Sequence, residues 1–165
     1  AFNESQKLHS VIQKILDGRK AALVTDSGTP TISDPGNRLI SEAIKNNIEL
    51  IAVPGASAVI AALSISGLPT DSFVFEGFIP QKKGRQKKLQ QLAIEERTIV
   101  LYRIEKLIDE LAEYMPERYI VVCRELTKKF EECWRGYPEE IKEQLPTKVI
   151  KGEFVIVISP KNWKQ

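Results

Sequence analysis

The sequence predicts an α/β protein with two α/β domains, the first of which carries a parallel sheet. Short apolar runs alternate with segments of helical periodicity, and the connections between them are short. Strands that alternate with helices in this way pair in parallel through right-handed crossovers. The rhythm breaks at residues 67–71, GLPTD, where glycine and proline lie close together. We therefore expect a first domain over residues 1–70 and a second, with a mixed sheet, over residues 71–165.

The first domain begins with an amphipathic helix. Asn3 and Gln6 have capping-box spacing, and apolar residues then repeat at helical intervals from Leu8 to Leu16, before Gly18. The elements expected next are a strand over residues 21–25, a helix in which Leu39 and Ile44 share a face, a strand over residues 49–53, and a helix that ends near Ser66.

The second domain has a different sequence pattern, in which longer polar segments connect the expected elements. Apolar, β-branched runs predict strands over residues 73–79, 98–102, 119–124 and 154–158. Helical patterns cover residues 89–94, 106–114 and 138–144, and residues 80–88 form a polar, basic connection. Trp134 and Tyr137 are expected to be packing residues rather than a base-stacking platform.

Composition and charge exclude several classes of protein. The 24 lysine and arginine residues nearly balance the 22 aspartate and glutamate residues, so bulk charge does not indicate a nucleic-acid-binding protein, although a local patch still can. No apolar run approaches the roughly 20 residues of a membrane helix. His9 is the only histidine, which argues against a zinc cluster or a histidine-based triad, so we expect no metal. Cys123 and Cys133 lack a CxxC spacing and are expected to be free thiols in a reducing cytoplasm.

Two loops form the first candidate site, because each follows a predicted strand of the same parallel sheet and the carboxyl ends of such strands share one rim. Glycine lets backbone approach a ligand, and the helix that starts near Ser57 offers unpaired N–H groups. Two ordinary strand-to-helix turns are the alternative, since the residue types are those of turns. The candidate residues are Asp26, Ser27, Gly28, Thr29 and Pro30 in one loop, and Pro54, Gly55, Ala56 and Ser57 in the other.

A basic segment forms the second candidate site, with five positive charges in seven residues: Lys82, Lys83, Arg85, Lys87 and Lys88. Such a segment can clamp phosphates, although a solvated, flexible loop explains the same pattern. No aromatic residue is interleaved in it, so stacking on single-stranded bases would need Phe78 or Tyr102.

A third group of polar residues follows the apolar run over residues 120–123. Arg124, Glu125 and Thr127 lie where this buried strand should end, a common place for functional residues. Ion pairs within the segment, Arg124 with Glu125 or Lys128 with Glu132, are the competing interpretation.

Four ordered blocks resemble a known family. They read TDSGTPTISDPGNRL, VPGASAVIAALSISGLPTDSFVFEGFIPQKKGRQKKL, RELTKKFEE and KGEFVIVI, and together they cover nearly the whole chain. In order and spacing they resemble the bacterial ribosomal RNA small subunit methyltransferase I family, in the tetrapyrrole methylase superfamily. The resemblance implies an S-adenosylmethionine-dependent enzyme, a homodimer, that methylates a cytidine ribose 2'-hydroxyl in 16S ribosomal RNA.

The resemblance also implies roles for the candidate residues. The two loops and, from the second domain, Arg124 and Thr127 would bind the cofactor between the domains, and the basic segment would bind RNA. Asp26 and Glu125 are the carboxylates at predicted strand ends that could accept the hydroxyl proton, and Lys82 or Arg124 could stabilise the developing alkoxide.

The chain departs from the family pattern in two places. The family begins with a strand and a cofactor loop that are not found ahead of Ala1, so we expect part of the cofactor cleft to be missing. After residues 98–102, relatives read close to YESPHR where this chain reads YRIEKL. Methylation of a small tetrapyrrole is the alternative activity, and a non-catalytic dimerisation or RNA-binding fragment is the alternative of another class.

Overall fold

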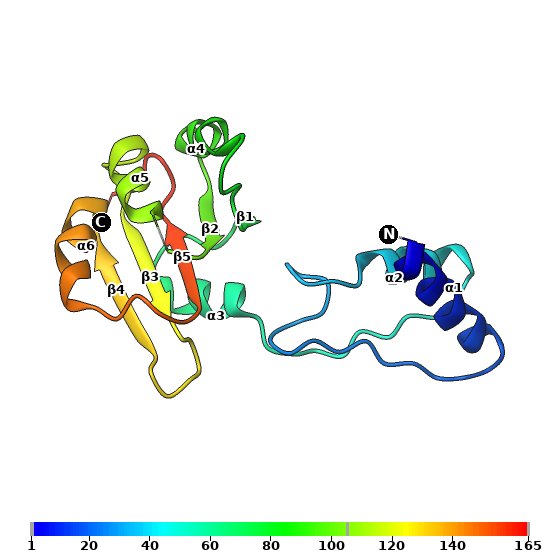
Figure 1. Cartoon of the computed structure of the whole chain (residues 1–165). Helices are drawn as coiled ribbons and strands as arrows, with labels where there is room; N and C mark the ends of the chain where they lie inside the picture. Colours follow the sequence, from blue (N-terminus) through cyan, green and yellow to red (C-terminus); the bar gives the residue numbers. More distant parts are fainter. Residues whose placement is uncertain (1, 105, 165) are drawn as a thin grey trace. The chain divides into compact units, whose positions relative to one another are not determined.

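A computed structural model describes residues 2–104 and 106–164, with the side chains of residues 2–6 outside that description (Figure 1). These residues form two compact units, Ala1–Ser57 and Ala58–Gln165, which are described separately. The domain boundary at residue 70 stays a prediction.

The second unit is built on a five-stranded mixed sheet with strand order β1-β2-β5-β3-β4. Strands β1 and β2 are parallel, and the remaining neighbours are antiparallel. The strands are β1 (Phe73–Gly77), β2 (Thr98–Tyr102), β3 (Ile120–Arg124), β4 (Glu132–Gly136) and β5 (Phe154–Ile158). Strand β4 was not expected from the sequence, whereas β2 and β5 have the predicted bounds.

Helices cover both faces of this sheet, which explains why its central strands are continuous apolar runs. Successive residues of β5 alternate between the two faces: Ile156 packs in one apolar cluster and Val157 in the other. The first cluster is covered by α4 (Arg85–Ala93), α5 (Leu107–Tyr114) and α6 (Pro138–Gln144), and the second by α3 (Ala58–Ser66) (Figure 1). A short 3₁₀ helix, Leu145–Thr147, follows α6. Trp134 is buried in the first cluster, as expected.

Helix α4 begins four residues before the predicted start, which corrects the interpretation of residues 80–88 as one polar connection. Gly84 precedes the helix in a left-handed conformation (φ 87°), and the lysine and glutamine residues that follow are good helix formers. The second half of the basic segment is therefore helical, so its side chains project from a fixed backbone.

Buried Arg118 joins three elements of this unit. Its side chain is only 3% exposed and lies just before β3. Its guanidinium donates hydrogen bonds to main-chain carbonyls beyond β5 and at the end of α4, those of Ser159 (3.0 Å), Leu92 (3.4 Å), Ala93 (3.0 Å) and Glu95. This residue therefore fixes where α4 ends on the sheet.

The first unit contains two helices, α1 (Phe2–Leu16) and α2 (Asn37–Lys45), as the apolar periodicity predicts. The Asn3–Gln6 capping pair lies outside the described side chains. The strands predicted at residues 21–25 and 49–53 are wrong: both segments lack ladder pairing in the described chain. Val24 is 81% exposed and Val53 is 83% exposed. An apolar run becomes a strand only when another strand takes its backbone hydrogen bonds, and no described residue does so here.

Cys123 and Cys133 are free thiols that lie directly opposite each other on β3 and β4. Their sulfur atoms are 2.8 Å apart. Hydrogen bonding from Cys123 to the Cys133 sulfur lowers the pKa of Cys133 to about 7, against the opposing effect of burial. The same pairing, together with burial, raises the pKa of Cys123.

We expect iodoacetamide to react with Cys133 first, and its rate to rise with pH through about 7 rather than near the ordinary thiol pKa of 9.0. The thiolate is the reactive form, and a lowered pKa populates it at lower pH. Mass spectrometry of peptides alkylated over a pH series measures this. A Cys133→Ser variant is the control, because buried Cys123 should then stay unmodified. A midpoint near pH 9 for Cys133 would contradict the expectation.

Candidate functional site

The structure brings together the two loops of the first candidate site. The Thr29 hydroxyl donates a hydrogen bond of 2.9 Å to the main-chain carbonyl of Ala56. Gly28 has φ 75°, and a Cβ atom on it would lie 3.8 Å from the same carbonyl oxygen. Residues 26–30 and 54–57 therefore lie side by side within the first unit, although no sheet of this unit holds them there.

Left-handed backbone conformations lie in and beside the sequence blocks of interest. Thr31 (φ 73°) and Ser33 (φ 60°) follow the first loop, and Glu125 (φ 49°) and Thr127 (φ 64°) follow β3. Arg103 (φ 73°) follows β2. Non-glycine residues pay for such conformations, and these costs concentrate at functional sites. Asn47 (φ 55°), just after α2, has the same conformation outside these blocks, so ligand binding by these segments stays a prediction.

Asp26 is exposed at the start of the first loop. Within the described chain it makes no hydrogen bond or ion pair. Its carboxylate therefore stabilises no other described residue of this unit and is available to a ligand.

Arg124, in contrast, is 7% exposed and is bonded to three other residues. Its guanidinium donates to the carbonyls of Lys151 (2.8 Å) and Phe130 (3.3 Å) and pairs with the Glu132 carboxylate at 3.1 Å. Ion pairing within the segment therefore occurs, but with Glu132 rather than with Glu125. Thr127 is exposed, and its N–H donates to the Glu131 carboxylate. Cofactor binding by Arg124 and Thr127 stays a prediction.

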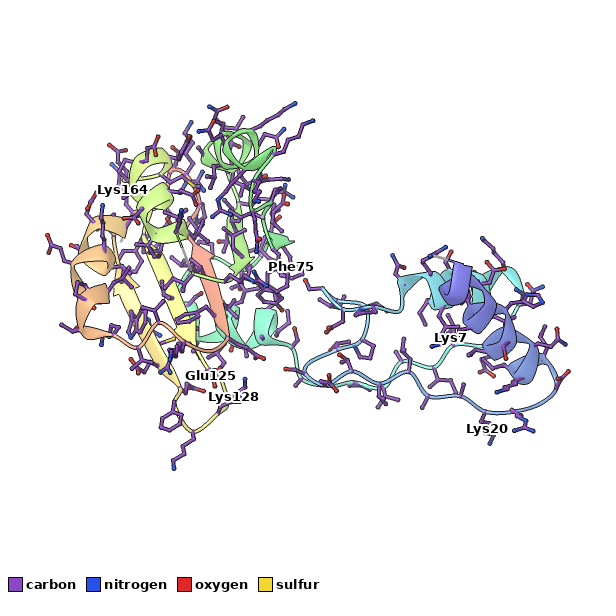
Figure 2. The ribbon with its side chains drawn as sticks, viewed as in Figure 1. Lys7, Lys20, Phe75, Glu125, Lys128 and Lys164 are labelled. Atoms are coloured by element: carbon purple, nitrogen blue, oxygen red, sulfur yellow. The ribbon has the colours of Figure 1, made fainter. Side chains whose placement is uncertain are left out.

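Glu125 also has structural partners. Its carboxylate accepts a hydrogen bond of 2.7 Å from the main-chain N–H of Glu153 and another of 3.3 Å from Lys128 (labelled in Figure 2). The Glu153 N–H, followed by Lys128, lowers the pKa of Glu125. Lys128 also pairs with the Glu153 carboxylate at 2.9 Å. These bonds connect the turn after β3 to the segment that leads into β5.

Gly152 leaves the space that Glu125 occupies. A Cβ atom on Gly152 (φ 107°) would lie 2.6 Å from a Glu125 carboxylate oxygen. We expect Gly152→Ala to lower the free energy of unfolding by about 2 kcal/mol, from backbone strain and displacement of Glu125. Urea unfolding of purified variants measures this.

Gly67→Ala is the matched control for Gly152→Ala. Gly67 also has a positive φ of 73°, but nothing lies within 4 Å of its added Cβ. The control therefore carries backbone strain without a steric conflict. Equal destabilisation by the two substitutions would show that the Glu125 contact has no energetic weight.

The five cations of the basic segment divide into two kinds. Arg85 makes a bidentate pair with Glu110 on α5, at 2.6 and 2.5 Å, and Lys88 pairs with Glu76 on β1 at 3.0 Å. Lys82, Lys83 and Lys87 are exposed and have no ion pair among the described residues. Two cations thus anchor the segment, and three present charge to solvent.

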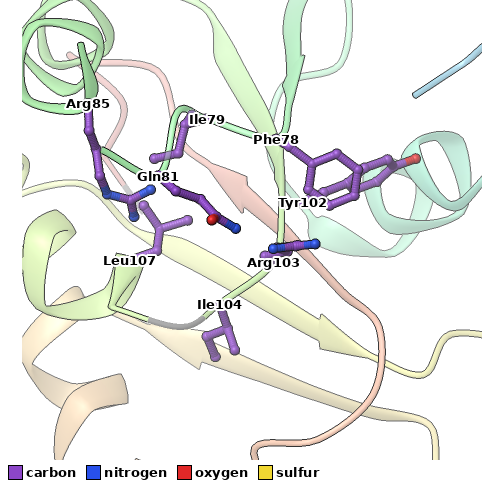
Figure 3. A pocket seen from close by; sticks show the side chains of 8 residues that line it. All are labelled: Phe78, Ile79, Gln81, Arg85, Tyr102, Arg103, Ile104 and Leu107. Carbon is purple, nitrogen blue, oxygen red and sulfur yellow. The ribbon is translucent and has the colours of Figure 1, made fainter. Parts of the chain in front are cut away.

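A cavity of about 140 Å³ lies beside this segment, at the carboxyl ends of parallel strands β1 and β2 (Figure 3). Its lining residues are Phe78, Ile79, Gln81, Arg85, Tyr102, Arg103, Ile104 and Leu107. Gln81 and Arg103 were not candidates from the sequence. The only available signal was the position of Arg103 in the YRIEKL segment directly after a strand.

Neither a metal cluster nor a membrane helix emerges from the described residues. No group of three His, Cys, Asp or Glu side chains there is placed to hold a metal ion. No described helix is both long and apolar enough to span a bilayer.

Residues 1–142 match the model of the Tetrapyrrole (Corrin/Porphyrin) Methylases. The chain belongs to the tetrapyrrole methylase family. The matched residues of this tetrapyrrole methylase include the two loops, the basic segment and the turn after β3. All three candidate sites therefore lie in the region that matches the family model.

Several proteins named ribosomal RNA small subunit methyltransferase I are similar to this tetrapyrrole methylase. The one from Synechocystis sp. is 45% identical over 163 residues, covering 95% of this chain and 58% of that protein. The one from Thermotoga maritima is 35% identical over 163 residues, covering 96% of this chain and 73% of that protein. The chain thus spans a little over half the length of the first of these relatives.

Solved structures with the same fold are more distant in sequence. A cobalt precorrin-4 methyltransferase of cobalamin biosynthesis has a TM-score of 0.65 at 17% identity, covering 94% of this chain and 70% of that one. The methyltransferase CobJ has a TM-score of 0.68 at 18% identity, covering 96% and 72%. A uroporphyrin-III C-methyltransferase from Thermus thermophilus, solved with S-adenosyl homocysteine, has a TM-score of 0.59 at 15% identity, covering 93% and 72%. These likenesses confirm the tetrapyrrole methylase fold.

Proposed function

We propose that the protein carrying this chain is an S-adenosylmethionine-dependent methyltransferase that modifies a cytidine ribose 2'-hydroxyl in 16S ribosomal RNA. The observation that carries the proposal is the 35% identity to the Thermotoga maritima ribosomal RNA small subunit methyltransferase I, of which this chain covers 73%. Three exposed lysines beside a cavity at the strand ends support a polyanionic substrate. Such an enzyme would act in the cytoplasm on the RNA or the small subunit, as a homodimer.

The loops of the first unit suit the cofactor chemically. Small side chains, the close approach at Gly28 and the exposed main chain of residues 26–30 and 54–57 offer hydrogen-bonding groups to an amino acid and a nucleoside. In the second unit, we propose Arg124 and Thr127 as further cofactor-binding residues. S-adenosylmethionine supplies a methyl group on a positively charged sulfur.

Methyl transfer to a hydroxyl is an in-line displacement, in which the carbon–oxygen bond forms as the carbon–sulfur bond breaks. Alignment of the three atoms supplies much of the acceleration. The hydroxyl must lose its proton, and we assign Asp26 to accept it, with Glu125 as the second candidate base. Lys82 is the exposed cation that would stabilise charge on the oxygen, since Arg124 is already paired.

Methylation of a small tetrapyrrole is the second candidate, favoured by the fold likeness to the corrin and uroporphyrin enzymes. Transfer of a tritiated methyl group by the full-length protein separates the two. We expect label in the 16S RNA of small subunits, recovered as 2'-O-methylcytidine. Label in uroporphyrinogen III alone would support the second candidate and contradict the first. Label in neither substrate would contradict both candidates.

We expect replacement of the three exposed lysines, Lys82, Lys83 and Lys87, by alanine to flatten the salt dependence of RNA binding. Each phosphate contact adds about 0.7 to the slope of log affinity against log salt for single strands, so three add about 2. A filter-binding titration of the full-length protein measures the slope.

Removing three exposed lysines elsewhere, Lys20, Lys161 and Lys164, is the charge-matched control (Lys20 and Lys164 are labelled in Figure 2). Its slope should stay near that of the unmodified protein. Lys88→Ala should change the slope less than a single exposed lysine does, because Glu76 already neutralises Lys88. An unchanged slope in the triple variant would remove the basic segment from the RNA interface.

A further inference from the structure

The cavity beside the basic segment has the chemistry of a site for one planar ring. Phe78 and Tyr102 form its aromatic side, with ring centroids 5.3 Å apart, and the Arg103 guanidinium lies 5.0 Å from the centroid of Phe78. Figure 3 shows the Gln81 amide between Arg85 on one side and Phe78 and Arg103 on the other. Aromatic faces and guanidinium planes stack on bases, and an amide can donate to and accept from a base edge.

The local backbone builds this arrangement. A bulge between Phe75 and Gly77 shifts the β1–β2 register, and Gly77 (φ 58°) turns the chain at the end of β1. Phe78 is left 52% exposed beside Tyr102. Bulges at a sheet edge re-aim side chains and are common next to sites. The Arg103 N–H donates to the Phe154 carbonyl at 3.1 Å, which fixes the left-handed residue that carries the guanidinium.

The polar side of the cavity is also held rigidly. Arg85 lines the cavity while its guanidinium is bonded to Glu110 and to the Pro80 carbonyl at 2.9 Å. The hydrogen bond from Arg85 to Pro80 thereby closes the connection between these two residues. Lys82 and Lys83 lie on this connection and directly follow Gln81, a lining residue, in the sequence. A ring in the cavity would thus have cations nearby for the phosphates attached to it.

We propose that this cavity, formed by Phe78, Gln81 and Arg103, receives a single unstacked base of the RNA. The inference rests on the proposed RNA substrate and adds where a base is held. A volume of about 140 Å³ matches one ring and lies well below the pockets of roughly 300–1,000 Å³ that hold larger ligands, such as a four-ring macrocycle. The base stacks on Phe78, and the Gln81 amide bonds its edge.

Phe78→Ala in the full-length protein tests the proposal. We expect affinity for single-stranded RNA to fall about ten-fold, the order of one lost base stack, while the salt slope stays unchanged. Affinity for duplex RNA should change little, because its bases are not available. Phe78→Tyr keeps the aromatic face and should restore binding. Since Phe78 is half exposed, the thermal midpoint should stay near that of the unmodified protein.

Phe130→Ala is the matched control. Phe130 is 61% exposed and has a lysine, Lys129, 5.6 Å from its ring centroid, so it offers the same kind of group away from the cavity. An equal loss in this control would overturn the proposal. The proposal would also be overturned if the unmodified protein methylates RNA and the Phe78→Ala variant binds RNA with the same affinity. If the unmodified protein neither binds nor methylates RNA, the proposed function fails first. Displacement of bound RNA by uroporphyrinogen III would assign the cavity to a tetrapyrrole instead.

Discussion

Replacing Arg118 with methionine is expected to lower the free energy of unfolding by about 3–5 kcal/mol. The side chain is buried, and its guanidinium donates to four main-chain carbonyls that methionine would leave unsatisfied. Methionine has a similar length, so the loss comes from those carbonyls rather than from a cavity. Burial lowers the pKa of Arg118, yet the group stays charged at any pH of the experiment.

Equilibrium unfolding in urea, followed by tryptophan fluorescence, measures the effect, because Trp134 lies in the core of the same unit. Arg97→Met is the control on a neighbouring segment. Arg97 is half exposed and bonds only Glu95 among the described residues, so its loss should change stability little. If both variants unfold at the same urea concentration, the carbonyl cluster around Arg118 does not stabilise the fold as argued.

Replacing Asp26 with asparagine in the full-length protein is expected to lower methyl transfer about 100-fold or more, the usual contribution of a general base. The substitution keeps the size of the side chain but replaces the carboxylate, which can take a proton, with a neutral amide, which cannot. Because Asp26 makes no bond within the described chain, stability should be unaffected. Turnover with saturating cofactor and small subunits measures the loss.

Two further substitutions sharpen this result. Asp34→Asn changes a carboxylate in the same loop that has no proposed role, and should leave turnover near normal. Glu125→Gln weakens the bonds to Glu153 and Lys128 and should mainly loosen the turn after β3. If Glu125→Gln abolished turnover while Asp26→Asn did not, Glu125 would be the base and Asp26 a turn residue.

Much of the second unit could be predicted from the sequence. Strands β2 and β5 read TIVLY and FVIVI, apolar on both faces because helices cover both sides of the sheet. Strand β4, ECWRG, was missed because it lies at the sheet edge and has few apolar side chains. Residues 21–25 and 49–53 were wrongly predicted as strands because periodicity cannot report whether a pairing partner is present.

The candidate site was partly predictable as well. The adjacency of residues 26–30 and 54–57 was expected from α/β topology, and the Thr29–Ala56 bond confirms that they meet. The division of the basic segment was not predictable, because Glu110 lies 25 residues from Arg85. Gln81 and Arg103 were likewise missed, since only the tertiary structure brings them to one cavity.

The two ion pairs that anchor the basic segment have a consequence for how quickly and tightly it can engage a phosphate chain. A flexible run of lysines must give up conformational freedom on every encounter, which subtracts from its attraction. Here the pairs to Glu110 and Glu76 have already removed much of that freedom during folding. The backbone that carries the three exposed lysines is therefore ordered before binding, so less conformational entropy would be lost in the proposed complex with RNA.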